Sequence, residues 1–169
     1  MEITLERFFN KGSYFLLTGS VFRSLYTDIL GREHATGFDR KFTVTFAGGK
    51  EWQVGRNKQN LIQLNFKVVA GGPARFTPVD LEQSMLKGYT VRDHQNPFSL
   101  EDDFYFKPDL KIAFKKNRKA SNWSLGLDIM NVTGKTYLTG QWYDEANQKV
   151  VNGYDALGMF PNLFYRWEF

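Results

Sequence analysis

Hydrophobic and polar residues alternate along much of the 169-residue chain. The alternation is clearest from Phe104 to Lys115, where the hydrophobic residues have even numbers, and Lys107, Asp109 and Lys111 have odd numbers. The hydrophobic set is Phe104, Phe106, Leu110, Ile112 and Phe114. Successive side chains of a β-strand point to opposite faces, so this segment is predicted to be a strand with one apolar and one charged face.

The same alternation predicts a chain of about seven strands in all. The other segments are Glu2 to Phe9, Tyr14 to Thr27, Lys41 to Val54, Ile62 to Ala70, Asn122 to Ile129, and Leu163 to Phe169. Hydrophobic residues keep a helical spacing nowhere except in a short turn around Leu81 to Leu86. The chain is therefore predicted to be all-β.

The predicted connections alternate between short and long. The short ones are Asn10 to Ser13, Arg56 to Asn60 and Asn117 to Ser121, and the long ones are Asp28 to Arg40, Phe76 to Asp103 and Lys135 to Gly158. Bacterial outer-membrane barrels have short turns in the periplasm and long loops outside the cell. Several segments also exceed the roughly 9 to 11 residues that a tilted strand needs to cross a bilayer. We therefore expect antiparallel transmembrane β-strands, with Phe169 in the periplasm.

Seven strands are too few, and odd in number, for a single-chain bacterial barrel, which has an even count of at least about eight. An open sheet in lipid would leave unpaired backbone groups in hydrocarbon. We therefore expect further strands before Met1. The segment from Met1 to Phe9 has no secretory signal pattern, so a complete protein would be cytoplasmic, whereas a fragment would have its export signal upstream.

The amino-acid composition excludes several kinds of chemical site. The chain contains no cysteine, which excludes thiolate metal sites, disulfides and cysteine nucleophiles. Aromatic residues make up 17% of the chain, and its hydrophobic runs are too short for a membrane-spanning helix. The two histidines, His34 and His94, lie in different predicted loops, so we expect no metal site, no cofactor and no enzyme activity.

Four stretches together resemble the C-terminal barrel region of TonB-dependent outer-membrane receptors of the Bacteroidetes type. They are Ala47 to Asp80, Phe104 to Asn117, Ser124 to Tyr137, and PNLFYRWEF from Pro161 to Phe169. The resemblance implies the last strands of a 22-stranded barrel with an N-terminal plug and a segment that contacts TonB. It also implies uptake of an iron chelate, cobalamin or a glycan. The chain lacks the signal, the plug and the earlier strands, so we expect it to work only with the remainder of the receptor.

The last predicted strand has hydrophobic residues at alternate positions up to the terminal residue. They are Leu163, Tyr165, Trp167 and Phe169. Such an ending resembles the signal read by the barrel-assembly machinery, and a strand with a free edge is suited to pairing with another edge. The same residues also fit the lipid-facing aromatic girdle of an ordinary barrel strand. Both interpretations remain open.

In the barrel interpretation, one face of each predicted strand contacts lipid and the other faces the lumen. The hydrophobic residues from Phe104 to Phe114 are expected to face lipid, whereas Lys107, Asp109 and Lys111 are expected to face the lumen. The longest loop carries Arg75, Arg92, Asp93 and His94, which could contact a substrate, although Phe76 to Asp80 also fits a plain strand exit. The net charge of +4 and the basic run from Lys115 to Lys119 fit periplasmic turns and lumen-facing lysines, so no nucleic-acid partner is expected.

Two alternatives remain. One is an outer-membrane barrel enzyme or a small porin-like channel. The other is a soluble β-sandwich binding module, which would bury its apolar faces against each other.

Overall fold

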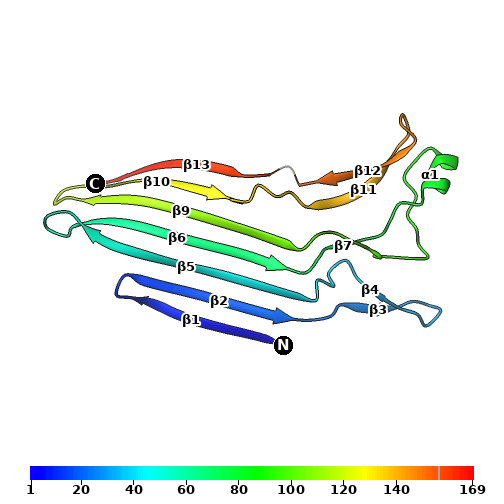
Figure 1. Cartoon of the computed structure of the whole chain (residues 1–169), viewed down its shortest axis with the longest axis horizontal. Helices are drawn as coiled ribbons and strands as arrows, with labels where there is room; N and C mark the ends of the chain where they lie inside the picture. The colour runs from blue at the N-terminus through cyan, green and yellow to red at the C-terminus, as the bar shows by residue number, and fades with distance from the viewer. Residues whose placement is uncertain (156) are drawn as a thin grey trace.

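The computed structural model describes residues 1–155 and 157–169. Its centre is one antiparallel sheet of seven strands in the order β1-β2-β5-β6-β9-β10-β13 (Figure 1). These strands are β1 (Glu2–Asn10), β2 (Ser13–Val21), β5 (Phe42–Val54), β6 (Asn60–Gly71), β9 (Tyr105–Asn117), β10 (Asn122–Met130) and β13 (Phe160–Glu168). The structure thus confirms the all-β prediction and the seven main strands.

The short connections lie at one end of the sheet, which we call the turn end, and the long ones lie at the other, the loop end (Figure 1). The C-terminus also lies at the turn end. In the first turn, Asn10 pairs with Ser13, and both Lys11 and Gly12 have positive φ. Two successive positive φ angles are typical of the tight hairpin turn whose twist matches that of the strands. The predicted alternation of short and long connections is confirmed.

The long connections contain secondary structure of their own. Each holds a two-stranded sheet: β3 (Leu25–Thr27) with β4 (Glu33–Ala35), β7 (Arg75–Phe76) with β8 (Leu100–Glu101), and β11 (Leu138–Asp144) with β12 (Lys149–Tyr154). The helix α1 (Leu81–Lys87) begins after Asp80, whose side chain accepts a hydrogen bond from Gln83 N. It lies where the sequence predicts a short helical turn. The described residues contain no helix long and apolar enough to cross a membrane.

The strand predicted from Tyr14 to Thr27 is wrong in one respect, because it is divided into β2 and β3. The backbone N–H of Ser24 and the guanidinium of Arg23, between the two strands, both donate to the carboxylate of Asp39. The chain leaves the main sheet at this point to reach the carboxylate. Phe104 also lies one residue before β9 rather than inside it.

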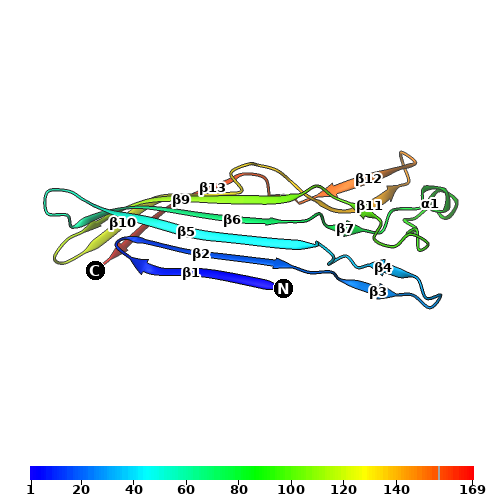
Figure 2. The ribbon, with the colours of Figure 1, turned by 60° about the horizontal axis from the view of Figure 1, so that its bottom comes forward.

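The main sheet is open. β1 and β13 form its two edges and do not pair with each other, so the described chain does not close into a barrel. In the second view the strands near β13 cross those near β1 at an angle, as expected from the twist that strands accumulate across a sheet (Figure 2).

Candidate functional site: the two faces of the sheet and its loop end

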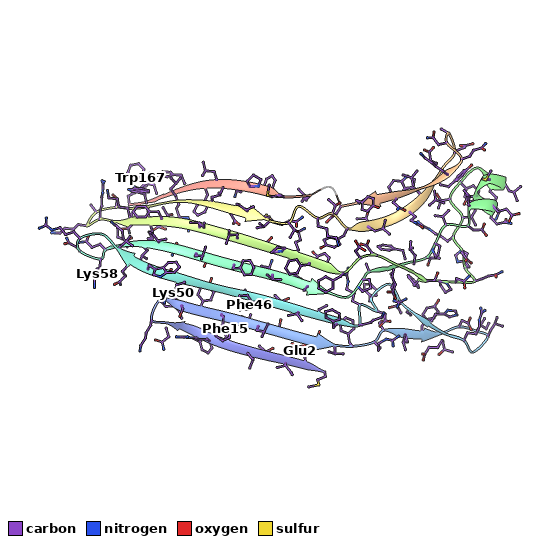
Figure 3. The ribbon with its side chains drawn as sticks, viewed as in Figure 1. Glu2, Phe15, Phe46, Lys50, Lys58 and Trp167 are labelled. Atoms are coloured by element: carbon purple, nitrogen blue, oxygen red, sulfur yellow. The ribbon has the colours of Figure 1, made fainter. Side chains whose placement is uncertain are left out.

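Strand pairing places the apolar residues of all seven strands on one face of the sheet. Residues directly opposite each other in paired strands point to the same side of a sheet. One such row is Leu5, Leu17, Phe46, Val68 and Pro108, and another is Trp52, Ile62, Phe114, Leu125 and Tyr165. The alternation in each segment thus combines into a single surface. It includes Phe15 and Phe46, which are labelled in Figure 3.

Most of this apolar face is accessible. Ile3, Ile112 and Leu163 have exposed fractions of 54%, 48% and 72%. The buried hydrophobic side chains of the described chain are few, namely Ala113, Tyr137 and Leu138. A sheet that packed this face inside a sandwich would instead bury such residues as its core. The described chain therefore leaves this apolar face uncovered.

The residues expected to face lipid share this face. Phe106, Leu110, Ile112 and Phe114 alternate along β9 with the polar set. Phe104 precedes the strand, but its ring centre lies 6.4 Å from that of Phe106 and 6.2 Å from that of Phe42, at the loop end. A second aromatic group lies at the turn end, where the Trp123 ring is 5.7 Å from Phe114 and 6.2 Å from Tyr165. Aromatic rings therefore lie near both ends of the apolar face.

The terminal strand contributes to the same face. Leu163, Tyr165 and Trp167 pair with Leu127, Leu125 and Trp123 of β10. Phe169 follows β13, with its ring 6.1 Å from that of Trp167. All four predicted residues are exposed, and the outer edge of β13 has no strand partner among the described residues. The free strand edge, which the assembly-signal interpretation needs, and the exposed rings, which the aromatic-girdle interpretation needs, therefore occur together in β13 and Phe169.

The opposite face is mostly polar. One row across six strands consists of Tyr14, Gly49, Asn65, Lys111, Asp128 and Asn162. Lys107, Asp109 and Lys111 all lie on this face. The Asp109 carboxylate is 3.6 Å from Lys67 Nζ and accepts a hydrogen bond from Asn131 N, while Lys111 Nζ lies 4.5 Å from the centre of the Phe164 ring.

Two glycines let aromatic rings lie flat on the polar face. A Cβ at Gly126 would be 2.6 Å from the ring of Phe164, and one at Gly49 would be 2.6 Å from the ring of Tyr14. The Tyr14 hydroxyl donates to Asn65 Oδ1 at 2.8 Å. Because neither glycine has a side chain, these rings cover the backbone instead of projecting away from the sheet.

A cavity of about 180 Å³ lies at the loop end. Its lining includes Arg40, Asp102, Asp103, Tyr105, Tyr137 and Asp155. Asp102 accepts a hydrogen bond from Leu138 N, and Asp155 accepts one from Tyr137 N, both at 2.8 Å. Asp103 lies 3.1 Å from Lys135 Nζ. The carboxylates that line this cavity therefore hold the start of β11 in place.

A charged network joins the first two long connections at their base. Asp39 is fully buried, and its carboxylate accepts hydrogen bonds from Arg23 Nε at 3.0 Å and Ser24 N at 3.0 Å, with Arg75 Nε 3.8 Å away. Arg75 also pairs with Glu101 of β8. Burial acts to raise the pKa of Asp39, but the Arg23 and Ser24 hydrogen bonds and the charges of Arg23 and Arg75 hold that pKa below its usual value.

Of the four residues proposed to contact a substrate, three make contacts within the loop end. Arg75 is mostly buried in the charged network, and Arg92 Nη1 donates to Thr77 O within its own loop. Asp93 accepts hydrogen bonds from the Asn96 side chain and from Gln95 N, which lower its pKa. His94 is exposed. Three of the four residues therefore maintain the fold of the loop.

Sequence patterns did not identify the turn that follows β10. Asn131 has a φ of 52° and is 1% exposed, and its amide donates to Lys135 O at 2.9 Å and to Leu157 O at 3.3 Å. An asparagine tolerates the left-handed conformation and bonds to nearby backbone, so the Asn-Val-Thr-Gly stretch was the available signal. Together with Tyr137, this turn attaches the β11–β12 hairpin to β9.

The histidines lie apart. His34 Nε2 is 3.0 Å from Asp28 Oδ2, and this hydrogen bond is the largest of the causes that hold the pKa of Asp28 well below its usual range. Within residues 1–155 and 157–169, no three His, Cys, Asp or Glu side chains are grouped so that they could hold a metal ion. The candidate site of this chain is therefore the pair of sheet faces, one apolar and one polar.

Comparison of the chain with known protein families, curated proteins and solved structures found no match.

Proposed function

We propose that this chain forms part of the wall of a bacterial outer-membrane transport barrel of the TonB-dependent receptor type. In this proposal the apolar face contacts lipid and the polar face lines the lumen. The loops lie outside the cell, and Phe169 lies in the periplasm. The observation that carries the proposal is the apolar face that continues across all seven strands.

Energetics favour lipid over water on that face. Moving a large apolar side chain out of water stabilises a protein by about 1.5 to 3 kcal/mol. Residues such as Ile112 and Leu163 are exposed on the isolated sheet, and few hydrophobic side chains are buried elsewhere in the described chain. Contact with lipid would recover this free energy, whereas exposure to buffer would not.

The dimensions also fit a bilayer. Phe104 and Phe114 are ten residues apart, which corresponds to about 33 Å along an extended strand. At the tilt of about 40° typical of membrane barrels, this length covers about 25 Å of depth, close to the usual apolar band. The aromatic groups near both ends match the positions of the interfacial girdles.

The open edges of β1 and β13 suit pairing with further strands, because unpaired backbone groups are costly in hydrocarbon. The receptor type itself rests on the resemblance of the four stretches. The proposed nutrient class, an iron chelate, cobalamin or a glycan, rests on the same resemblance.

Site-directed spin labelling tests the orientation of the faces. The chain has no cysteine, so Leu163→Cys and Asn162→Cys each provide a unique label on neighbouring positions with opposite orientation. After refolding in lipid, the label at position 163 should be accessible to oxygen and protected from a water-soluble nickel chelate. The label at position 162 should show the reverse. Equal access of the chelate to both labels would overturn the lipid-facing assignment.

Transport is tested in cells that lack the gene for this chain. Loss of growth on one limiting nutrient, restored by the intact gene, supports the receptor proposal if uptake also stops when the inner-membrane proton gradient is collapsed. Uptake that persists without the gradient would indicate a passive channel instead. Unimpaired growth and uptake on iron chelates, cobalamin and glycans would contradict a role in their transport.

A further inference from the structure

The short turns carry basic residues and no acidic ones. Lys11 lies in the first turn, Arg56 and Lys58 in the second, and Arg118 and Lys119 in the third. Lys50 and Lys116 lie close to these turns on the adjoining strands. Together these seven residues form what we call the basic rim. The rim borders the apolar face at the turn end, where Lys50, Lys58 and Trp167 are labelled in Figure 3.

Two of these lysines belong to the apolar face itself. Lys50 pairs with Leu64, and Lys116 pairs with Trp123, so both side chains leave the sheet on the apolar side. Lys50 Nζ reaches the first turn and donates to Lys11 O at 3.2 Å. Among the described residues neither lysine has an acidic partner within ion-pair distance. Long basic side chains at the border of an apolar surface typically extend their charge towards the lipid–water interface.

Tryptophans accompany the basic rim. Trp52, Trp123 and Trp167 lie on the apolar face close to the turn end. Tryptophan is enriched at the level of lipid headgroups, where its apolar ring and its N–H group meet different surroundings. The combination of unpaired lysines and tryptophans on one border fits a headgroup layer better than bulk water.

The loop end has a different charge balance. Segments 22–41, 72–104 and 131–159 contain twelve of the 18 acidic residues but nine of the 22 basic ones. The positive charge of the chain therefore concentrates on the strands and turns, with the basic rim at one end. Such an asymmetry gives the turn end a positive potential that attracts anions.

We infer that the basic rim binds the phosphate groups of anionic phospholipids in the membrane leaflet at the turn end. This inference rests on the proposed function, because it requires the apolar face to be in lipid. Lysine binds phosphate through its charge and arginine through paired hydrogen bonds. Lys50 and Lys116 are the central contacts, since their side chains leave the apolar face beside the tryptophans.

The test measures partitioning of the full chain, refolded from denaturant, into vesicles of phosphatidylcholine alone or of equimolar phosphatidylcholine and phosphatidylglycerol. Tryptophan fluorescence and flotation report insertion. The variants are Lys50→Gln with Lys116→Gln, and, as a control with the same loss of charge, Lys87→Gln with Lys149→Gln in the loop-end segments. A cation near an anionic surface changes partitioning by about fivefold, so the rim variant should lose about 25-fold of its preference for anionic vesicles.

The control variant should keep that preference, and salt should weaken it in the unmodified chain. Equal partitioning of the unmodified chain into both vesicle types would overturn the inference while leaving the proposed function intact. Equal losses in the two variants would also overturn it, because net charge alone would then explain the binding. Binding to polyglutamate without a preference for anionic vesicles would indicate an acidic protein partner and reject the lipid assignment. Absence of the unmodified chain from the floating fraction with both vesicle types would instead contradict the proposed function, because an apolar face that contacts lipid would bind vesicles even with its strand edges unpaired.

Discussion

The hydroxyl of Tyr137 lies 2.7 Å from both the backbone N and the backbone O of Phe106. It accepts a hydrogen bond from the N–H group and donates one to the carbonyl. β9 extends beyond the end of β10 at this position, so one side chain replaces the missing strand partner. The Tyr137 ring also packs against Tyr105, with 4.5 Å between the ring centres.

Tyr137→Phe should therefore destabilise the loop end without changing its shape. The variant keeps the ring but leaves two backbone groups of Phe106 without their partner, which costs about 1 to 3 kcal/mol. Urea titration of the folded chain measures the free energy of unfolding. Tyr143→Phe is the control, because the Tyr143 hydroxyl has no hydrogen bond within the described residues. An equal effect of the two substitutions would show that Tyr137 does not replace a strand.

Asp39→Asn should loosen the base of the first two long connections. The carboxylate is fully buried between Arg23 and Arg75, and Arg75 is itself largely buried. Removing the negative charge leaves Arg75 with Glu101 as its remaining acidic partner, and we expect a loss of about 2 to 3 kcal/mol. Limited proteolysis should detect faster cleavage in residues 22–41. Asp128→Asn, on the polar face, should leave that cleavage rate unchanged, and unchanged cleavage in Asp39→Asn would contradict the role of the network.

The same carboxylate should make the loop end sensitive to acid. The pKa of Asp39 is lower in the folded chain than the usual 3.8, so its charged form stabilises the fold fully above about pH 4. This stabilisation is lost as the pH falls through the folded pKa. Unfolding measured between about pH 5 and pH 2 should show a shallower decline for Asp39→Asn than for the unmodified chain. Parallel curves would show that other carboxylates, such as Asp28, dominate the acid response.

Gly126→Ala should disturb the pairing of β10 with β13. The new Cβ would lie 2.6 Å from the Phe164 ring and 2.8 Å from the backbone oxygen of Ile112, so the ring must move. Overpacking of this kind costs about 1 to 3 kcal/mol. Gly19→Ala in β2 is a matched control, since nothing lies within 4 Å of its added Cβ. The free energy of unfolding should be lower for Gly126→Ala than for Gly19→Ala. Equal values would argue against tight packing of Phe164 on the strand.

Leu17→Arg should impair membrane insertion far more than Thr18→Arg. The two positions are adjacent in β2, but Leu17 pairs with Leu5 and Phe46 on the apolar face, whereas Thr18 pairs with Thr4 and Thr45 on the polar face. An arginine facing the middle of the bilayer costs about 2 to 4 kcal/mol, whereas changes that face the lumen are tolerated. Partitioning into phosphatidylcholine vesicles measures the difference. Similar partitioning of both variants would reject a bilayer around this sheet.

Local sequence patterns were enough to predict the strands of the main sheet and their two faces. The even-numbered hydrophobic residues from Phe104 to Phe114 show the face of β9 directly, because a strand has a side-chain period of two. The short turns were equally clear, since glycine, asparagine and lysine cluster between the alternating segments. These features depend on neighbours in the chain, and local patterns therefore suffice to predict them.

The rows of residues that continue across the sheet, and the contacts that hold the loop end together, became visible only in the three-dimensional fold. Asp39 meets Arg75 across 36 positions of sequence, and Tyr137 reaches Phe106 across 31. No periodicity links such partners, because contacts between loops depend on where the strands bring their ends. For the same reason the sequence did not show that Arg75 pairs with Glu101.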